Sequence, residues 1–250
     1  MTSDPQTGHR LDEALVARGF FDSRSRARDA ILRGSVTVAG AKVEKPGKLV
    51  PATVEIAVDD PARAYVSRAA LKLIAGLDHF RVDPSGAVAL DLGASTGGFT
   101  QVLLERGAAR VFAVDVGHGQ MRPEIAADSR VTLLEGVNAR DLDAGHLGRE
   151  QPSFLCSDVS FISLRLALPP ALSLMAAGAK AILLFKPQFE VGRERVGKGG
   201  LVEDAVGHAA ADDFTAWLDG QPGWSVAGLV PSPIAGGDGN HEYLVGAVKT

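Results

Sequence analysis

Four polar side chains of this 250-residue chain follow apolar runs, at points where buried strands would end. They are Asp91, Asp115, Asp158 and Lys186. Ligands of open α/β sheets bind at the carboxyl ends of the strands, so we expect these groups to surround one site. Carboxylates there attract a cation or accept hydrogen bonds from hydroxyl groups, and a lysine can orient a hydroxyl group or move its proton. The four residues therefore indicate a cofactor that carries positive charge or hydroxyl groups.

The loop that follows the first of these strands has the composition of a ligand-binding turn. In the stretch 87–100, AVALDLGASTGGFT, glycines at positions 93, 97 and 98 allow positive φ and a close approach of the backbone to a ligand. The spacing differs from the GxGxxG of dinucleotide-binding loops, because alanine and serine follow Gly93. Asp91 would also repel a pyrophosphate pressed against the same turn. The loop alone favours a cationic cofactor and leaves a dinucleotide, or a turn without any ligand, as alternatives.

The elements that would position these groups alternate between strands and helices from Val88 onward. This alternation predicts a parallel sheet covered by helices on both faces. The last two strands have no helix between them, so we expect them to pair antiparallel at one edge. Asp115 closes the second strand at roughly the 20-residue spacing where an acid binds ribose hydroxyls, although an aspartate there can also simply begin a turn. The expected strands cover 88–92, 110–116, 130–136, 153–159, 179–187, 224–231 and 242–249.

An amphipathic helix is predicted just before the first strand of this sheet, over 67–80. Ser67 is its candidate N-cap, and Leu71, Ile74 and Leu77 are expected to face inward. A lysine on such a helix, here Lys72, is ordinarily exposed to solvent.

The segment 9–59 is predicted to be a small module separate from the sheet. Its first half shows two helical patterns, and the second begins after Ser23, a residue that can cap it. Short β-rich pieces follow, separated by glycine turns. Two helices followed by a small sheet make a module of about 50 residues.

The charge of this module differs from that of the whole chain, whose net charge is −4. Between residues 18 and 48, eight Lys or Arg stand against three acids. Arg24, Arg26 and Arg28 lie within about one helical turn and form a patch suited to phosphates. The alternative interpretation is a solvated helix face, which is the more common reason for a basic run.

The remaining composition is that of an ordinary globular protein, with 46% hydrophobic and 22% charged residues. A single cysteine, Cys156, excludes an internal disulfide and a thiol cluster for a metal. No apolar run reaches the roughly 18 residues that span a bilayer, and the first ten residues lack the features of a signal peptide. We therefore expect a cytoplasmic protein without a metal site or a membrane segment.

The pattern D-x-G-x-x-x-G, from Asp91 to Gly97, resembles the cofactor loop of class I S-adenosylmethionine methyltransferases. The expected antiparallel strand pair at the end of the sheet is similar to theirs as well. The resemblance implies S-adenosylmethionine, a cofactor with a sulfonium and an ammonium group and without a pyrophosphate. The cofactor contacts that it implies are Asp91, Gly93, Ala94, Ser95, Thr96, Gly97, Gly98, Phe99, Asp115, Val116, Asn138 and Asp158.

The stretch RLDEALVARGFFDSRSRARDAILRGSVTVAGAKV closely resembles the small RNA-binding domain named after ribosomal protein S-four. The resemblance includes the helix that begins at the Ser-Arg pair and the GSVTVAG turn. It implies that the basic module binds structured RNA, which the charge count alone does not establish. The RNA contacts that it implies are Arg10, Arg24, Arg26, Arg28, Arg33, Lys42 and Arg68.

Lys72, Asp158, Lys186 and Glu242, in this order, resemble the Lys-Asp-Lys-Glu set of FtsJ-like 2′-O-ribose methyltransferases. Within that group the match is to the TlyA family, through SRAALKL, DLGASTGGFT, SDVSFISL, LLFKPQFEVG and GNHEYL and through the RNA-binding module in front. The resemblance covers nearly the whole chain after His9. It implies methyl transfer from S-adenosylmethionine to the 2′-hydroxyl of a cytidine in ribosomal RNA. Other members of the family carry the name hemolysin.

The resemblance gives the Lys-Asp-Lys-Glu set a task that its chemistry can perform. A ribose hydroxyl is a poor nucleophile near neutral pH, so an enzyme must position it and provide a base as the methyl group arrives. Lys186 is the candidate base or hydroxyl-orienting group, and Lys72 is a nearby cation that would favour its neutral form. Asp158 and Glu242 would orient the two amines. No metal is required, because the cationic sulfur departs as a neutral thioether.

We therefore expect an RNA-binding domain at 9–60, a linker at 61–66 and an α/β, Rossmann-like class I methyltransferase domain at 67–250. Two other functions stay open: a catalytically silent RNA-binding or ribosome-assembly protein with this fold, and a membrane-active protein, as the name hemolysin suggests. The lack of a secretion signal or an amphipathic membrane segment in the sequence argues against the second. The target nucleotide, the ribosomal subunit and the oligomeric state do not follow from the sequence.

Overall fold

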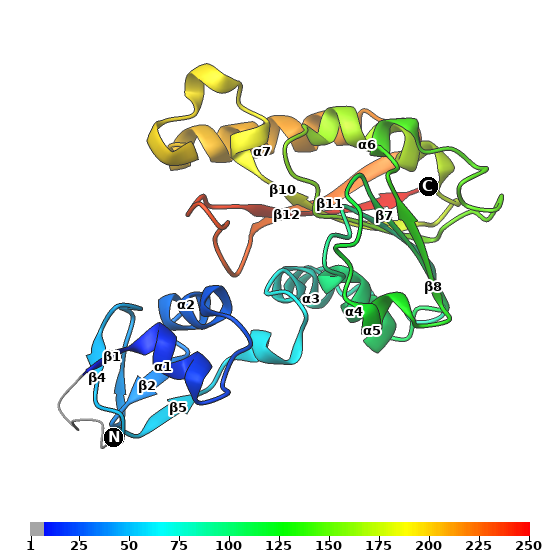
Figure 1. The fold of residues 1–250 in the computed structure, drawn as a ribbon. Helices are drawn as coiled ribbons and strands as arrows, with labels where there is room; N and C mark the ends of the chain where they lie inside the picture. The colour runs from blue at the N-terminus through cyan, green and yellow to red at the C-terminus, as the bar shows by residue number, and fades with distance from the viewer. Residues whose placement is uncertain (1–7) are drawn as a thin grey trace. The chain divides into compact units, whose positions relative to one another are not determined.

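The computed structural model describes residues 8–250 and divides the chain into two compact units. The first unit extends to Ala64, and the second covers Tyr65–Thr250 (Figure 1). No helix within residues 8–250 is long and apolar enough to cross a membrane. The two units have separate cores, so each is described by itself.

The first unit packs two helices, α1 (Leu11–Ala17) and α2 (Arg24–Leu32), on short antiparallel strands. Its core is formed by apolar residues of both helices and of β2, among them Leu15, Ile31 and Val36. The predicted cap of the second helix is confirmed, because the Ser23 hydroxyl accepts a hydrogen bond from the Arg26 amide. The other elements are β1 (His9–Arg10), β2 (Val36–Val38), β3 (Ala41–Lys42), β4 (Leu49–Val50), β5 (Ile56–Val58) and η1 (Pro61–Ala64).

The second unit is built on a seven-stranded sheet with the order β11-β12-β10-β9-β6-β7-β8. All neighbouring pairs from β10 to β8 are parallel, and β12 pairs antiparallel with both β10 and β11. The predicted parallel sheet with an antiparallel C-terminal pair at one edge is therefore confirmed. The strands are β6 (Val88–Leu92), β7 (Arg110–Asp115), β8 (Val131–Glu135), β9 (Phe154–Ser157), β10 (Lys180–Phe185), β11 (Trp224–Pro231) and β12 (Tyr243–Lys249).

Helices cover both faces of this sheet (Figure 1). On one face, α3 (Ala70–His79), α4 (Gly98–Glu105) and α5 (Pro123–Ala126) pack against a core that includes Ala89. On the other face, α6 (Leu164–Leu174) and α7 (Asp204–Asp219) pack against Leu90 and Leu92. Successive side chains of a strand point to opposite faces, so Asp91 points to the side of α3 and α4. Four 3₁₀ turns complete the unit: η2 (Ala139–Asp141), η3 (Pro187–Phe189), η4 (Arg193–Arg195) and η5 (Lys198–Gly200).

The start and the buried face of α3 differ from the prediction. The helix begins at Ala70, and Ser67 lies in the turn before it, where its hydroxyl accepts a hydrogen bond from the Ala69 amide at 3.2 Å. Ser67 is held there by close packing on α4, because a Cβ on Gly98 would come within 2.9 Å of the Ser67 Cβ. Leu71 and Ile74 are only partly buried. Leu77 is buried as predicted, and the buried face also carries Leu73 and Lys72, which is 5% exposed.

Candidate active site

A cavity of about 610 Å³ opens at the carboxyl ends of the parallel strands β6, β7 and β9. Four segments line it: 93–95, 114–120, 137–140 and 158–166. Six of the predicted cofactor residues are on its walls, namely Gly93, Ser95, Asp115, Val116, Asn138 and Asp158. The other six are not among the lining residues: Asp91, Ala94, Thr96, Gly97, Gly98 and Phe99. The cavity is thus where sequence reasoning expects a cofactor, although only half of the predicted residues face it.

The glycine-rich loop is shaped by close backbone contacts. Gly93 has a φ of +82°, and a Cβ at this position would lie 2.9 Å from the Val159 amide nitrogen. Ser95 also has a positive φ, of 45°, and its amide donates a hydrogen bond to Oδ2 of Asp115 at 2.8 Å. The other oxygen of Asp115 accepts from the Gly117 amide at 2.7 Å. Asp115 therefore joins the two loops that border the cavity.

Asp91 lies directly under the loop and is fully buried. Oδ2 accepts a hydrogen bond from the Thr100 hydroxyl at 2.7 Å. Burial raises the pKa of Asp91 to about 7, and the hydrogen bond from Thr100 opposes this rise. The carboxylates of Asp158 and Asp115 are smaller causes of the same rise, because they repel the ionised form. A cation in the cavity would relieve this repulsion, so the residues present fit a positively charged cofactor.

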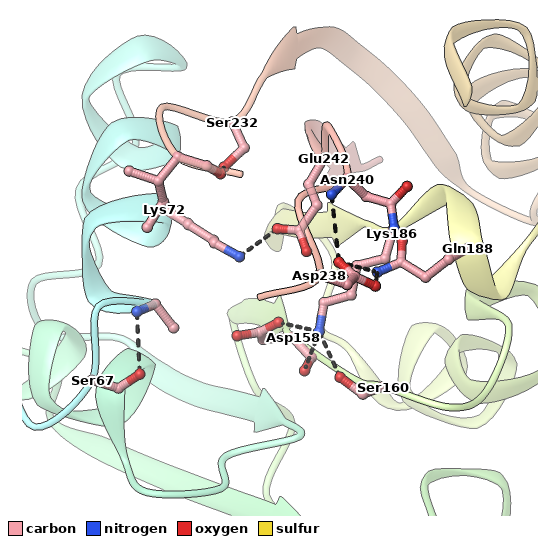
Figure 2. Close-up of polar contacts among 12 residues, drawn as sticks. Ser67, Lys72, Asp158, Ser160, Lys186, Gln188, Ser232, Asp238, Asn240 and Glu242 are labelled. Atoms are coloured by element: carbon pink, nitrogen blue, oxygen red, sulfur yellow. Dashed lines mark hydrogen bonds and ion pairs between the residues drawn. The ribbon is translucent and has the colours of Figure 1, made fainter. Parts of the chain in front are cut away.

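The four predicted catalytic side chains come together beside the cavity (Figure 2). They form two ion pairs, Lys72 with Glu242 and Lys186 with Asp158, the latter at 2.7 Å. Strand register explains the meeting, because Phe185 of β10 is the partner of Tyr243 of β12. Lys186 and Glu242 are the next residues outward, so they emerge side by side at the same edge of the sheet.

Both lysines are held almost out of solvent. Lys186 is 9% exposed, and its Nζ donates hydrogen bonds to Oγ of Ser160 at 2.7 Å and to the carbonyl oxygen of Asp158 at 3.3 Å. With the Asp158 carboxylate, three oxygen atoms surround this nitrogen, an arrangement that suits an ammonium group. This geometry favours Lys186 as a hydroxyl-orienting group over Lys186 as a free base.

Glu242 is the buried carboxylate of the second pair and is 4% exposed. Burial raises its pKa, and the charges of Lys72 and Lys186 only partly oppose this effect. A carboxylate in this position depends on Lys72 for its charge, because an unpaired buried charge is costly. We therefore regard Lys72 and Glu242 as a mutually dependent pair.

The predicted RNA-binding side chains have different surroundings. In the first unit, Arg24 pairs with Asp12 and Glu13 and remains about half exposed, and Arg28 is exposed. Arg33 is mostly buried in an ion pair with Asp60 at 2.8 Å, which leaves little of its guanidinium for a ligand. The other four are Arg10, which pairs with Asp12; Arg26, which contacts Asp22 and the Ala62 carbonyl; Lys42, which pairs with Glu44; and Arg68, which belongs to the second unit.

Sequence reasoning missed several residues that support this site. Ser160 contacts Lys186, and its place just after an expected strand end was a usable signal. Glu190 is mostly buried and accepts hydrogen bonds from the Ser163 hydroxyl and the Leu164 amide, both at 2.6 Å, so it fixes the start of α6. Burial raises the pKa of Glu190. Asn240 is also buried, and no local pattern singles it out.

The fold and the site together define a class I S-adenosylmethionine-dependent methyltransferase. The model of the FtsJ-like methyltransferase family matches residues 65–249, and that of the S4 domain matches residues 9–56. The chain belongs to the FtsJ-like methyltransferases and, within them, to the TlyA/hemolysin A family. S-adenosylmethionine is the methyl donor of this family, in agreement with the acidic, cation-attracting cavity.

Three relatives support the assignment at nearly full length. The 16S/23S rRNA (cytidine-2′-O)-methyltransferase TlyA of Mycobacterium tuberculosis is 42% identical over 94% of this chain and 88% of its own. Hemolysin A of Brachyspira hyodysenteriae is 38% identical over 94% of this chain and 98% of its own. A solved structure of a hemolysin from Streptococcus thermophilus matches 98% of this chain and 89% of its own, with a TM-score of 0.75 and 38% identity.

Proposed function

We propose that this protein transfers a methyl group from S-adenosylmethionine to the ribose 2′-hydroxyl of a cytidine in ribosomal RNA. The observation that carries the proposal is the convergence of two lysine–carboxylate pairs beside the cofactor cavity. The cytidine and the ribosomal RNA come from the names of relatives about 40% identical to this chain. The target nucleotide and the ribosomal subunit are for experiment to identify.

The chain's own residues would perform the positioning that a weak nucleophile needs. When bound, S-adenosylmethionine supplies an electrophilic methyl group on a cationic sulfur. Asp158 and Ser160 belong to the cavity wall, and both contact Lys186. Lys186 would exchange its longest hydrogen bond, that of 3.3 Å to the Asp158 carbonyl oxygen, for one to the ribose oxygen and so hold this oxygen at the cavity. Lys72 and Glu242 would fix the electrostatic field around it.

The RNA would be held by a separate part of the chain. We propose an RNA-binding domain at 9–60, a linker at 61–66 and the methyltransferase domain at 67–250, with ribosomal RNA or a ribosomal subunit as the partner. The match of residues 9–56 to the S4 domain and the exposed arginines of α2 support this division. With ribosomal RNA as the substrate, the protein would act in the cytoplasm.

The proposal is tested by incubating the full-length protein with labelled S-adenosylmethionine and with ribosomal subunits or bare ribosomal RNA. We expect label to enter the RNA at a 2′-O position of a cytidine, mapped as a site of resistance to alkaline cleavage. A protein that binds RNA but transfers no label would be the catalytically silent alternative. Leakage of lipid vesicles on addition of the protein would instead support the membrane-active alternative, and we expect none.

Changing Arg24, Arg26 and Arg28 together to alanine is expected to weaken RNA binding and its dependence on salt. Each lysine or arginine that neutralises a phosphate contributes about 0.9 to the slope of log K against log salt, so the slope should become shallower by roughly 2 to 3. Binding is measured by filter retention or fluorescence anisotropy across a series of salt concentrations.

Arg33→Ala is the matched control for this triple variant. It also removes an arginine from α2's end, but its partner Asp60 is 1% exposed, so the loss should lower the melting temperature instead of changing the salt slope. A triple variant with an unchanged slope would show that the RNA is bound elsewhere.

A further inference from the structure

The turn between β11 and β12 delivers Glu242 to the active site, and Asn240 lies two residues before it. Asn240 is 2% exposed. Its side chain accepts a hydrogen bond from the Val202 amide and donates one to the Gly200 carbonyl, both at 2.8 Å. Its own carbonyl oxygen accepts from the Gly236 amide at 2.9 Å. One side chain thus connects the turn to the segment that precedes α7.

Asp238 provides a second and more exposed anchor for the same turn. Its carboxylate accepts a hydrogen bond from Nε2 of Gln188 at 3.1 Å, and Gln188 is two residues after Lys186 (Figure 2). The turn is therefore tied both to the strand end that carries Lys186 and to the loop before α7. Of the two anchors, Asn240 is the buried one, and its hydrogen bond with the Val202 amide is buried as well.

An asparagine is well suited to this position. The Val202 amide requires an acceptor and the Gly200 carbonyl requires a donor, and one amide group supplies both. An aspartate would place a second acceptor against the Gly200 carbonyl, and an alanine would leave both backbone groups without a side-chain partner. Loss of these two buried hydrogen bonds would release the turn from the segment 200–202.

We propose that Asn240 is a positioning residue for methyl transfer, which holds the turn so that Glu242 stays paired with Lys72. This role rests on the proposed function, because it concerns the same site. Asn240 acts through Glu242 and touches neither the cavity wall nor Lys186 in the contacts described. Its removal should therefore affect the chemical step more than the binding of either substrate.

The test is a comparison of kcat, the KM for RNA and the Kd for S-adenosylhomocysteine among four proteins. They are the unaltered chain, Asn240→Ala, Glu242→Gln and the double variant, assayed under steady-state conditions with incubations long enough to measure slow transfer. We expect Asn240→Ala to lower kcat about tenfold, with the KM and the Kd within about twofold. In the Glu242→Gln background, Asn240→Ala should cause no further loss, because the residue through which it acts has already been changed.

Several outcomes would overturn the role. An equal further loss in the Glu242→Gln background would show that Asn240 acts independently of Glu242. A raised KM for RNA with an unchanged kcat would mean that the connection serves RNA binding instead. No transfer by the unaltered protein would overturn the proposed function and this role with it, whereas an active protein whose Asn240 variants are unaffected would overturn this role alone.

Two further variants guard against a simple folding defect. Gln221→Ala removes one side-chain hydrogen bond to a backbone carbonyl, that of Trp217 at 3.1 Å, in the same unit, and should leave kcat unchanged. Asn240→Asp preserves the size of the side chain and the acceptor for the Val202 amide, but it loses the donor to the Gly200 carbonyl. It should therefore also lower kcat, and it replaces the alanine variant in the test if that variant does not fold. Melting temperatures of all the variants show which of them are folded.

Discussion

Replacing Lys186 with alanine is expected to lower the rate of methyl transfer by about 10³-fold or more, a loss within the range that the positioning of a nucleophile can supply. Its Nζ is the group that the carboxylate of Asp158 and the hydroxyl of Ser160 hold beside the cavity. Without it, nothing in this position can orient the ribose oxygen. The binding of S-adenosylmethionine should persist, since removal of a neighbouring positive charge does not disfavour a cationic ligand.

Lys180→Ala is the matched control, because Lys180 is an exposed lysine at the opposite end of the same strand, β10. Transfer is measured with labelled cofactor, and cofactor affinity by titration calorimetry. Parallel loss of cofactor affinity in Lys186→Ala would mean that Lys186 belongs to the cofactor site. Transfer at the normal rate would remove Lys186 from the mechanism.

Asp91→Asn is expected to weaken the binding of S-adenosylmethionine and, at the same time, to stabilise the protein without ligand. The pKa of Asp91 in the folded chain is raised to about 7 from its ordinary 3.8, chiefly by burial. As the pH rises from about 4 to 7, the unfolded chain has already lost this proton and the folded chain still holds it, so folding stability falls over this window. Above pH 7 the ionised group costs the folded state on the order of 4 kcal/mol, which asparagine removes.

The affinity for the cofactor should show the opposite dependence on pH. A positively charged ligand prefers the ionised carboxylate, so affinity should rise as the pH increases through about 7. If ionisation of Asp91 is required, the gain between pH 6 and pH 8 is about tenfold. In Asp91→Asn this gain should disappear, apart from any titration of the ligand itself.

The melting temperature at pH 8 and the affinity across pH 6 to 8 check both expectations. Asp83→Asn, an exposed carboxylate just before the other end of the same strand, is the control and should change neither quantity. Normal affinity and an unchanged pH profile in Asp91→Asn would contradict the assigned role. A lowered melting temperature would show that the weaker hydrogen bond from Thr100 to a neutral amide costs more than the buried charge.

The sequence predicts the local features of this protein well, since they depend on neighbours along the chain. The hydrophobic run and the glycines after it predict the strand β6 and the turn that follows. Ser23 predicts the start of α2. The resemblance of the motifs predicts the family before any contact is known. A prediction that depended on tertiary packing was wrong at Ser67. This residue is not the N-cap of α3 but lies in the turn before it.

The site was less accessible to prediction because its contacts are distant in sequence. Lys72 and Glu242 are 170 residues apart, and no periodicity shows that a lysine on an amphipathic helix is buried against such a partner. The full burial of Asp91 and the hydrogen bonds of Asn240 also arise only from the assembled fold. The motif resemblance named four candidate catalytic side chains, and it could not say how they pair.

The place of β12 in the sheet also determines at which point of synthesis the candidate active site can assemble. This strand of seven residues is inserted between β10 and β11, and it is the last strand of the sheet to be made. A nascent chain without β12 can already pair the strands from β6 to β10. The edge of β10 that faces away from β9 is then open, and an open edge can pair with other chains. Glu242 reaches Lys72 when that gap closes, so a nascent chain that lacks β12 does not assemble the complete site.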